Sequence, residues 1–169
     1  MKVLVTGGLG FIGSNLVESL KKEAEVVVVD NLSSSRKDYK EILEKNSGVE
    51  YVLNCFSSDE VLNRVKNSEF DFIFHVAAIP RVSYSVENPY QTTEVNVGKT
   101  VKIMESCIDT KTKIIFSSSS SVYGGADIMP TPSSHPKDPK SPYAWQKSCI
   151  EDLLHVFYDL YKINSICLR

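Results

Sequence analysis

Short runs of apolar, mostly β-branched residues alternate along the chain with longer segments in which apolar residues recur at helical spacing. The short runs predict six strands, at residues 2–5, 25–29, 50–53, 71–75, 113–118 and 165–168. The longer segments predict five helices, at residues 11–23, 37–45, 59–66, 89–107 and 142–161. Some strand runs are apolar at nearly every position, such as Val26-Val27-Val28-Val29, which is typical of strands covered on both faces.

This alternation of strand and helix predicts right-handed crossovers between parallel strands and hence an α/β fold. We expect a Rossmann doubly wound parallel sheet with helices on both faces and strand order 3-2-1-4-5-6. In such a sheet a ligand binds at the carboxyl ends of the strands, near the switch between the first and fourth strands. Candidate site residues are therefore expected in the segments that follow strands.

The composition is that of a soluble single domain. The 169 residues are 42% apolar and 24% charged, and 19 basic against 21 acidic side chains give a net charge of −2. This balance predicts no nucleic-acid partner, and the lack of any apolar run of about 20 residues predicts no membrane span. Cys55, Cys107, Cys149 and Cys167 lack metal-binding or redox-motif spacing, so we interpret them as reduced thiols and expect no metal and a cytoplasmic location.

The glycine-rich turn after the first predicted strand indicates a dinucleotide-binding site. Residues 6–13 satisfy G-x-G-x-x-G through Gly8, Gly10 and Gly13, and T-G-x-x-G-x-x-G through Gly7, Gly10 and Gly13. Glycines permit a tight turn and a close approach to a pyrophosphate, and the N-terminus of the helix that follows attracts that anion.

The expected cofactor follows from Asp30, which comes at the end of the second strand, seventeen residues after Gly13. A carboxylate near this spacing binds the adenosine ribose hydroxyls and repels a 2′-phosphate, so we expect NAD rather than NADP. Arg36 argues in the other direction, because a nearby arginine can accommodate that phosphate.

A candidate acid–base pair lies in the last predicted helix. Tyr143 and Lys147 are four residues apart and so share one helical face. A lysine ammonium beside a tyrosine stabilises the phenolate and lowers its pKa, which lets the phenol act as a base. The five serines at 117–121 resemble a linker in composition, but they continue an apolar strand, which places them where this fold binds ligands.

Taken in order, these motifs resemble the extended short-chain dehydrogenase/reductase family, specifically its NAD-dependent nucleotide-sugar epimerase/dehydratase branch. The resemblance runs along the whole chain. Besides the glycine-rich turn it includes D-N-L-S from residue 30, H-V-A-A from residue 75, an asparagine within 94–98, S-S-S-S-S-V-Y-G at 117–124 and S-P-Y-x-x-x-K at 141–147. It implies an isomerase of carbohydrate metabolism, similar to the UDP-glucose and UDP-N-acetylglucosamine 4-epimerases.

The resemblance also implies roles for individual residues. Cofactor contacts are implied for Gly7, Gly10, Phe11, Ile12, Gly13, Asp30, Asn31, Ser33, Val76, Ala77, Ala78, Asn96, Ser117, Ser118, Tyr143 and Lys147. Tyr143 would remove the proton of the sugar hydroxyl, Lys147 would lower the pKa of Tyr143 and hold the nicotinamide ribose, and Ser119 would hydrogen-bond the reacting oxygen. Hydride would pass from sugar C4 to NAD and return to the other face of the 4-keto sugar.

Two local features bear on the subfamily. In the related 4,6-dehydratases, Asp-Glu follows the catalytic serine or threonine, whereas Ser120 and Ser121 stand there in this chain, which favours a 4-epimerase of UDP-hexoses. The loop at 79–83 resembles that of the N-acetylhexosamine or uronate epimerases more than that of the simplest galactose epimerases. An NAD-binding module without turnover and a 4,6-dehydratase are the alternatives.

Two departures from the family pattern qualify the expected function. Asn54 or Cys55 stands where the family places an aspartate that contacts adenine. The chain stops at Arg169, where family members continue into the lobe that binds the sugar nucleotide. We therefore expect residues 1–169 to be one NAD-binding domain with the C-terminal substrate lobe absent. In the family the helices at 89–107 and 142–161 form a homodimer interface, so a homodimer is a further prediction.

Three other residues were candidates on position alone. His75 at the end of a buried strand is interpreted as a hydrogen-bonded structural histidine rather than a base. Trp145 is interpreted as a packing residue. Tyr123 is left open between packing and contact with the substrate or nicotinamide.

Overall fold

The structure is a computed structural model that describes residues 1–34, 39–125 and 127–169. Arg36, the residue weighed for a 2′-phosphate, lies outside the described residues, as do the first two positions of the helix predicted at 37–45.

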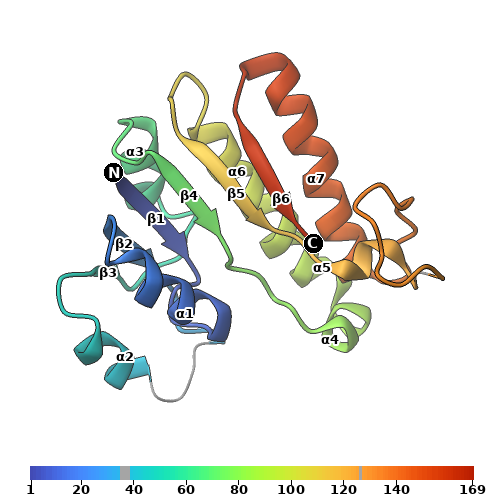
Figure 1. The fold of residues 1–169 in the computed structure, drawn as a ribbon, viewed down its shortest axis with the longest axis horizontal. Coiled ribbons are helices and arrows are strands. Elements are labelled where there is room, and N and C mark those ends of the chain that lie inside the picture. The colour runs from blue at the N-terminus through green and yellow to red at the C-terminus, as the bar shows by residue number, and fades with distance from the viewer. Residues whose placement is uncertain (35–38, 126) are drawn as a thin grey trace.

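Six parallel strands form one sheet in the order β3-β2-β1-β4-β5-β6, which confirms the predicted topology (Figure 1). The strands are β1 (Lys2–Thr6), β2 (Glu25–Val29), β3 (Glu50–Val52), β4 (Phe72–His75), β5 (Lys113–Ser117) and β6 (Ser165–Leu168). Thr6 at the end of β1 pairs with both Val29 and His75, the last residues of β2 and β4. The carboxyl ends of the central strands therefore lie level at one edge of the sheet.

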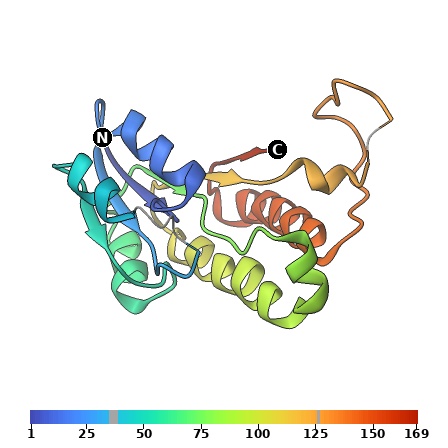
Figure 2. The same cartoon turned by 90° about the horizontal axis from the view of Figure 1, so that it is seen from below.

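Helices cover both faces of the sheet, because alternate strand residues face opposite sides (Figure 2). On one face the strand residues Val3, Val5, Val26 and Val28 pack with residues of α1 (Phe11–Leu20) and α2 (Tyr39–Lys45). On the other, strand residues such as Leu4, Val27, Ile73, Ile114 and Phe116 pack with residues of α3 (Asp59–Lys66), α6 (Thr100–Ser106) and α7 (Pro142–Tyr161). The near-continuous apolar strand runs are explained by this two-sided burial.

The helix predicted at 89–107 is a helical run with a local change of winding. It consists of α5 (Pro89–Thr93), the π-helical segment η1 (Glu94–Lys99) and α6, and Cys107 follows as the cap residue. Apolar periodicity could not show the widened turn, because the chain stays helical throughout. The π-helical segment carries Asn96, whose buried amide is described below.

Two short elements were not predicted. The sequence indicated a loop at 79–83 and no element at 84–87, but residues 82–87 form the helix α4 (Val82–Glu87), which packs against α7. Ser120–Tyr123 forms a 3₁₀ turn, η2, where the sequence indicated only a polar run after the strand. The side chain of Ser119 accepts a hydrogen bond from the Ser121 amide, which draws the chain out of the strand and into this turn.

Three further features concern the described part of the chain. None of its helices combines the length and the apolar character needed to cross a membrane. No group of three or more potential metal ligands gathers among these residues. All four cysteines are free thiols.

Candidate active site

A cleft of about 510 Å³ opens at the carboxyl ends of the central strands, where the doubly wound topology places a ligand. The predicted site residues that line it are Gly7, Gly10, Phe11, Ile12, Gly13, Asp30, Asn31, Ser33, Val76, Ala77, Ala78, Ser117, Ser118, Ser119, Tyr143 and Lys147. The cleft is also lined by Asn54, weighed above for the adenine contact, and by residues to which the sequence assigned no cofactor contact: Val29, Ser34, Phe56, Ile79, Pro80, Arg81 and Val95. Among the described residues that were predicted to contact the cofactor, only Asn96 does not line this cleft.

The glycine-rich turn leaves no room for side chains. Gly7 has a φ of +72° and donates its amide to Val29 O at 2.7 Å, which closes the turn onto β2. A Cβ on Gly7 would lie 2.8 Å from the Cα of Ala77, and a Cβ on Gly13 would lie 2.2 Å from the Gly7 carbonyl oxygen. The first amides of α1 have no partner inside the helix, so the turn forms a cradle of N–H groups that fits a pyrophosphate.

Asp30 is held beside this cradle by backbone amides. One carboxylate oxygen accepts from Leu9 N at 3.0 Å and the other from Leu32 N at 2.8 Å. The side chain is buried, yet it reaches the cleft lining. A carboxylate oxygen can accept a second hydrogen bond, so the fixed Asp30 can also bind hydroxyl groups of a ribose in the cleft.

Of Asn54 and Cys55, the two residues weighed for the adenine contact, only one lines the cleft. Asn54 lines the cleft together with Phe56, whereas Cys55 does not. The Asn54 amide is held by its own neighbours: its oxygen accepts from Cys55 N at 2.8 Å and its nitrogen donates to Glu60 at 3.3 Å. A neutral amide and an aromatic ring thus line this part of the cleft.

His75 is a structural histidine, as the sequence indicated. It is fully buried, with Nδ1 2.8 Å from Thr6 Oγ1 and Nε2 3.0 Å from Thr100 Oγ1. The Thr100 hydroxyl donates to Asn96 O, so it accepts from Nε2–H, and Nδ1 is left to accept from Thr6. Thr6 in turn accepts from the Ala77 amide at 3.2 Å, so the histidine helps to fix the segment that lines the cleft.

Burial, with a further contribution from the charge of Lys147, lowers the pKa of His75 to about 3. The unfolded chain takes up this proton near pH 6.5, so the stability contributed by neutral His75 is complete above that pH and is lost as the pH falls towards 3. We expect the free energy of unfolding to fall by about 1.4 kcal/mol per pH unit in this window because of His75.

Urea denaturation from pH 7 to pH 4.5 tests this expectation. His75→Gln should be less stable than the unmodified chain at pH 7 but should lose less stability on acidification. His155→Gln is the matched control, because His155 is exposed and should leave the slope unchanged. Equal slopes in the His75→Gln protein and the unmodified chain would contradict the assignment.

Asn96 and Gln146 form a buried clamp behind the cleft. The Asn96 amide accepts from Ile79 N at 2.8 Å and donates to Ile79 O at 3.1 Å and to Gln146 Oε1 at 2.8 Å. Gln146 donates to Thr92 and Thr93. Both amide hydrogens of Asn96 are used within the protein, so its side chain positions the loop at Ile79. The cofactor contact expected for Asn96 from the sequence stays a prediction.

Tyr143 begins α7 at the cleft. Its amide donates to the buried Ser85 Oγ at 3.1 Å, while Ser141 caps the helix by accepting from the Ala144 amide. Burial raises the pKa of the Tyr143 phenol above its ordinary value, and a hydrogen bond with the Ser119 side chain offsets part of that rise. The direction is opposite to the lowering expected from Lys147, because burial outweighs the hydrogen bond with Ser119.

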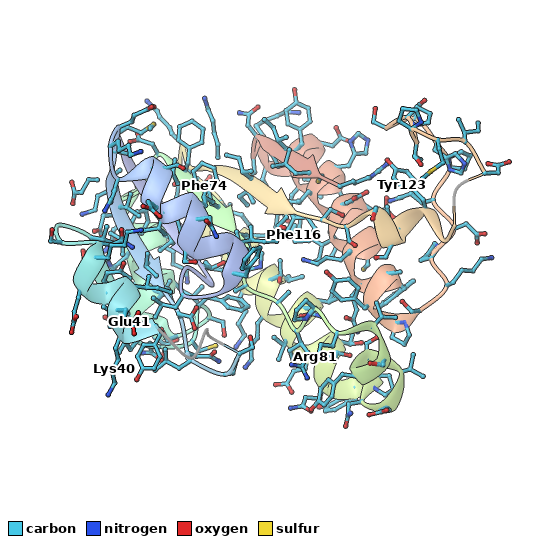
Figure 3. All side chains as sticks on the ribbon, turned by 60° about the horizontal axis from the view of Figure 1, so that its bottom comes forward. Lys40, Glu41, Phe74, Arg81, Phe116 and Tyr123 are labelled. Carbon is cyan, nitrogen blue, oxygen red and sulfur yellow. The ribbon has the colours of Figure 1, made fainter. Side chains whose placement is uncertain are left out.

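Lys147 lies one turn along α7 with its ammonium inside the protein. Nζ donates to Ser117 O at 2.6 Å and lies 4.6 Å from the centre of the Phe116 ring, which Figure 3 labels in β5. Burial lowers the pKa of Lys147 to about 8. Apart from one carbonyl and two aromatic rings, this side chain has little to compensate its charge, so it is suited to bind a further polar ligand group.

The serine run divides into three roles. Ser117 offers its carbonyl to Lys147, and Ser118 turns its hydroxyl away to the buried Glu151. Ser119 lies at the cleft, where its Oγ accepts from the Ser121 amide at 3.1 Å and hydroxyl at 2.8 Å. The serines of the run thus make different contacts, and the sequence pattern gave no signal for those of Ser117 and Ser118.

The interpretation of the sequence missed two residues that support the site. Ser85 lies in α4, a helix that was not predicted, and it holds the backbone of Tyr143. Gln146 stands between Trp145 and Lys147 and is fully buried. A polar residue three positions after Tyr143, on the same helical face, was the available signal for Gln146. No local pattern indicated Ser85.

This combination of fold and site defines the class of dinucleotide-binding α/β domains. A glycine-rich cradle, an acidic residue after the second strand, and a tyrosine and lysine on one helix converge on one cleft in a doubly wound sheet. The residues present fit a dinucleotide, since the unpaired first amides of α1 and the fixed Asp30 carboxylate lie at the same cleft.

The sequence matches the NAD dependent epimerase/dehydratase family over residues 3–169. The chain belongs to this family, which confirms the resemblance drawn from its motifs. The NAD dependence named for the family agrees with the predicted cofactor.

Several proteins named as UDP-sugar 4-epimerases are similar to the chain. It is 35% identical over 167 residues to a UDP-glucose 4-epimerase of Mycolicibacterium smegmatis, covering 97% of this chain and 53% of that protein. The structure of a UDP-N-acetylglucosamine 4-epimerase of Methanobrevibacter ruminantium with UDP-N-acetylmuramic acid matches with a TM-score of 0.90 and 34% identity, over 99% of this chain and 54% of that one. A Thermus thermophilus UDP-glucose 4-epimerase complex with NAD matches with a TM-score of 0.84 and 32% identity, over 100% and 54%. The chain spans about half the length of these relatives.

Proposed function

We propose that residues 1–169 form the NAD-binding and proton-transferring domain of a UDP-sugar 4-epimerase. The observation that carries this proposal is the convergence of Ser119, Tyr143 and Lys147 at the cleft that the glycine-rich turn also lines. The relatives named as UDP-sugar 4-epimerases, one of them solved with NAD, support it. Contacts to the nucleotide of the sugar are proposed to come from outside residues 1–169, because the relatives are about twice as long.

The residues that would hold NAD follow from the geometry. The turn at Gly7–Gly13 and the start of α1 take the pyrophosphate, and Asp30 takes the adenosine ribose. Val76, Ala77 and Ala78 line the path towards Lys147. Bound NAD supplies the acceptor for a hydride from sugar C4 and the donor that returns it.

The chain's own groups move and hold the proton. Tyr143 Oη takes the proton of the sugar C4 hydroxyl and gives it back after the ring has turned over. Ser119 Oγ, which lies beside Tyr143, hydrogen-bonds the same sugar oxygen. Lys147 stabilises the phenolate through its ammonium and holds a ribose hydroxyl, which compensates its buried charge.

The site offers little for a 4,6-dehydratase. Ser120 is exposed and Ser121 donates its hydroxyl to Ser119, so neither supplies the acid or base that elimination of water needs. The other alternative is a chain that binds NAD and does not turn over. The homodimer through residues 89–107 and 142–161 stays a prediction.

A product assay tests the proposed function. The purified chain with NAD is incubated separately with UDP-glucose, UDP-N-acetylglucosamine and UDP-glucuronate, and the products are separated by chromatography. We expect interconversion of C4 epimers for at least one sugar. Tight NAD binding without product from any of the three would favour the non-catalytic alternative, and a 4-keto-6-deoxy product would favour the dehydratase.

A further inference from the structure

One face of α7 contacts three consecutive serines at the end of β5. Tyr143, Lys147 and Glu151 are spaced by four residues and therefore lie in one row along the helix. Tyr143 interacts with the Ser119 side chain, Lys147 with the Ser117 carbonyl, and Glu151 with the Ser118 hydroxyl at 2.5 Å. The first two contacts belong to the site described above. Glu151 is not one of the described residues that line the cleft.

Glu151 is a buried carboxylate with an arginine partner. Arg169 Nε lies 3.0 Å from one carboxylate oxygen and Nη2 lies 2.7 Å from the other, which is a bidentate pair. Burial alone would raise the pKa of Glu151, but the hydrogen bonds from Arg169 and Ser118 hold it below its ordinary value. Lys137 adds a second cation at 3.6 Å, so the carboxylate is ionised and fixed in place.

This ion pair reaches both ends of the turn that carries Ser119. Ser118, which precedes Ser119, donates to Glu151. Tyr123, the last residue of the 3₁₀ turn, accepts from Arg169 Nη1 at 3.1 Å, and its ring lies 5.1 Å from the guanidinium carbon. Figure 3 shows Tyr123 beyond the end of β5, on the side of α7. The turn is thus held before and after the serine by one pair of charges.

The ion pair between Glu151 and Arg169 could serve only to join α7 to β6, or it could also fix the turn that carries Ser119. A pair that only joined α7 to β6 would need no contact with the serine run. Here Ser118 and Tyr123 are both buried and both bound to the pair, and Ser119 is the residue of this turn that faces Tyr143. A buried ion pair is in itself weak evidence of a stabilising role, because the cost of desolvating the charges offsets their attraction.

We propose that Glu151 is a positioning residue which, through Ser118 and Arg169, holds the Ser119 hydroxyl against Tyr143. The proposal rests on the proposed function, since it takes Ser119 and Tyr143 as the pair that acts on the sugar oxygen. Glu151 itself touches neither substrate nor cofactor.

Glu151→Gln tests this role, with Asp152→Asn as the matched control. Asp152 is the next residue of α7, is exposed, and forms an ion pair with the same Lys137, but it does not contact the serine run. Carbon-13 NMR of Cζ-labelled tyrosine, assigned with Tyr143→Phe, follows the Tyr143 titration in the NAD-bound protein. Hydrogen exchange reports on the amides of residues 119–124.

In Glu151→Gln we expect the Tyr143 titration to move up by about 0.7 pH unit, the equivalent of one lost hydrogen bond, and exchange in the turn to speed up. Turnover of the sugar should fall by about tenfold or more, with the effect on kcat larger than that on KM. Asp152→Asn should change none of these. An unchanged Tyr143 titration and unchanged exchange in folded Glu151→Gln would overturn the proposal.

Ser118→Ala keeps the test decisive if Glu151→Gln does not fold, because it removes one hydrogen bond and leaves the ion pair intact. It should shift the Tyr143 titration in the same direction, and no shift would overturn the role of Ser118. If the unmodified chain converts no sugar, the proposed function fails, whereas the titration and exchange still decide whether Glu151 positions Ser119.

Discussion

Tyr143→Phe is expected to lower the rate of epimerisation by about a thousandfold, the size of the effect of a positioned acid–base group. The substitution removes only the phenolic oxygen. The ring stays against Lys147, whose Nζ lies 5.9 Å from its centre, and the Tyr143 amide still donates to Ser85. NAD binding should therefore be retained, and the loss should fall on kcat. The rate is measured by chromatographic separation of the two UDP-sugar epimers.

Tyr84→Phe is the matched control for this substitution. It deletes the same atom from the neighbouring helix α4, where the Tyr84 hydroxyl donates to Gln91 at the surface. Its rate should equal that of the unmodified chain. If Tyr143→Phe retained more than about a tenth of the activity, another group would have to act as the base.

Gly13→Ala is expected to weaken NAD binding by about a hundredfold, the equivalent of losing one or two hydrogen bonds to a charged group. The added Cβ would meet the Gly7 carbonyl oxygen at 2.2 Å and the Gly8 Cα at 2.7 Å. These neighbours are backbone atoms of the turn, so the cradle of N–H groups itself must move. We expect a further loss of about 1–3 kcal/mol in the free energy of unfolding from the same overlap.

Gly98→Ala provides the control for the loss of a glycine as such. A Cβ on Gly98, in the π-helical segment η1, has no neighbour within 4 Å, so this variant should bind NAD normally and be no less stable. Binding is measured by titration calorimetry and stability by urea denaturation. NAD binding by Gly13→Ala with the affinity of the unmodified chain would contradict the assigned role of the turn.

Much of the cleft could be predicted because its residues lie in continuous motifs. The turn at Gly7–Gly13, Asp30 and the segment Val76–Ala78 each follow a strand directly, and the parallel sheet brings the ends of those strands together. Asn96 was assigned correctly to a helix, but the sequence did not indicate which groups its side chain contacts. Its direction depends on Ile79 and Gln146, which are 17 and 50 residues away in sequence.

The pKa of Tyr143 is a second property that could not be predicted from local sequence. The spacing to Lys147 indicated an attraction between ammonium and phenolate, and hence a lowered pKa. Burial raises the pKa instead, because desolvation of the phenolate depends on everything packed around the ring, which no local spacing describes. The lowering proposed for catalysis must come with the bound cofactor and substrate.

The sequence by itself determined the order of strands and helices, the glycine-rich cradle, the acidic residue beside it and the row of Tyr143 and Lys147 on one helix. These features are local, since each depends on periodicity or on a turn of a few residues. Only the tertiary structure decided that Asn96 and Gln146 clamp the loop behind the cleft, and that Glu151 and Arg169 hold both ends of the Ser119 turn. The physical reason is that buried hydrogen bonds and ion pairs join residues distant in sequence, and their partners exist only once the helices have packed on the sheet.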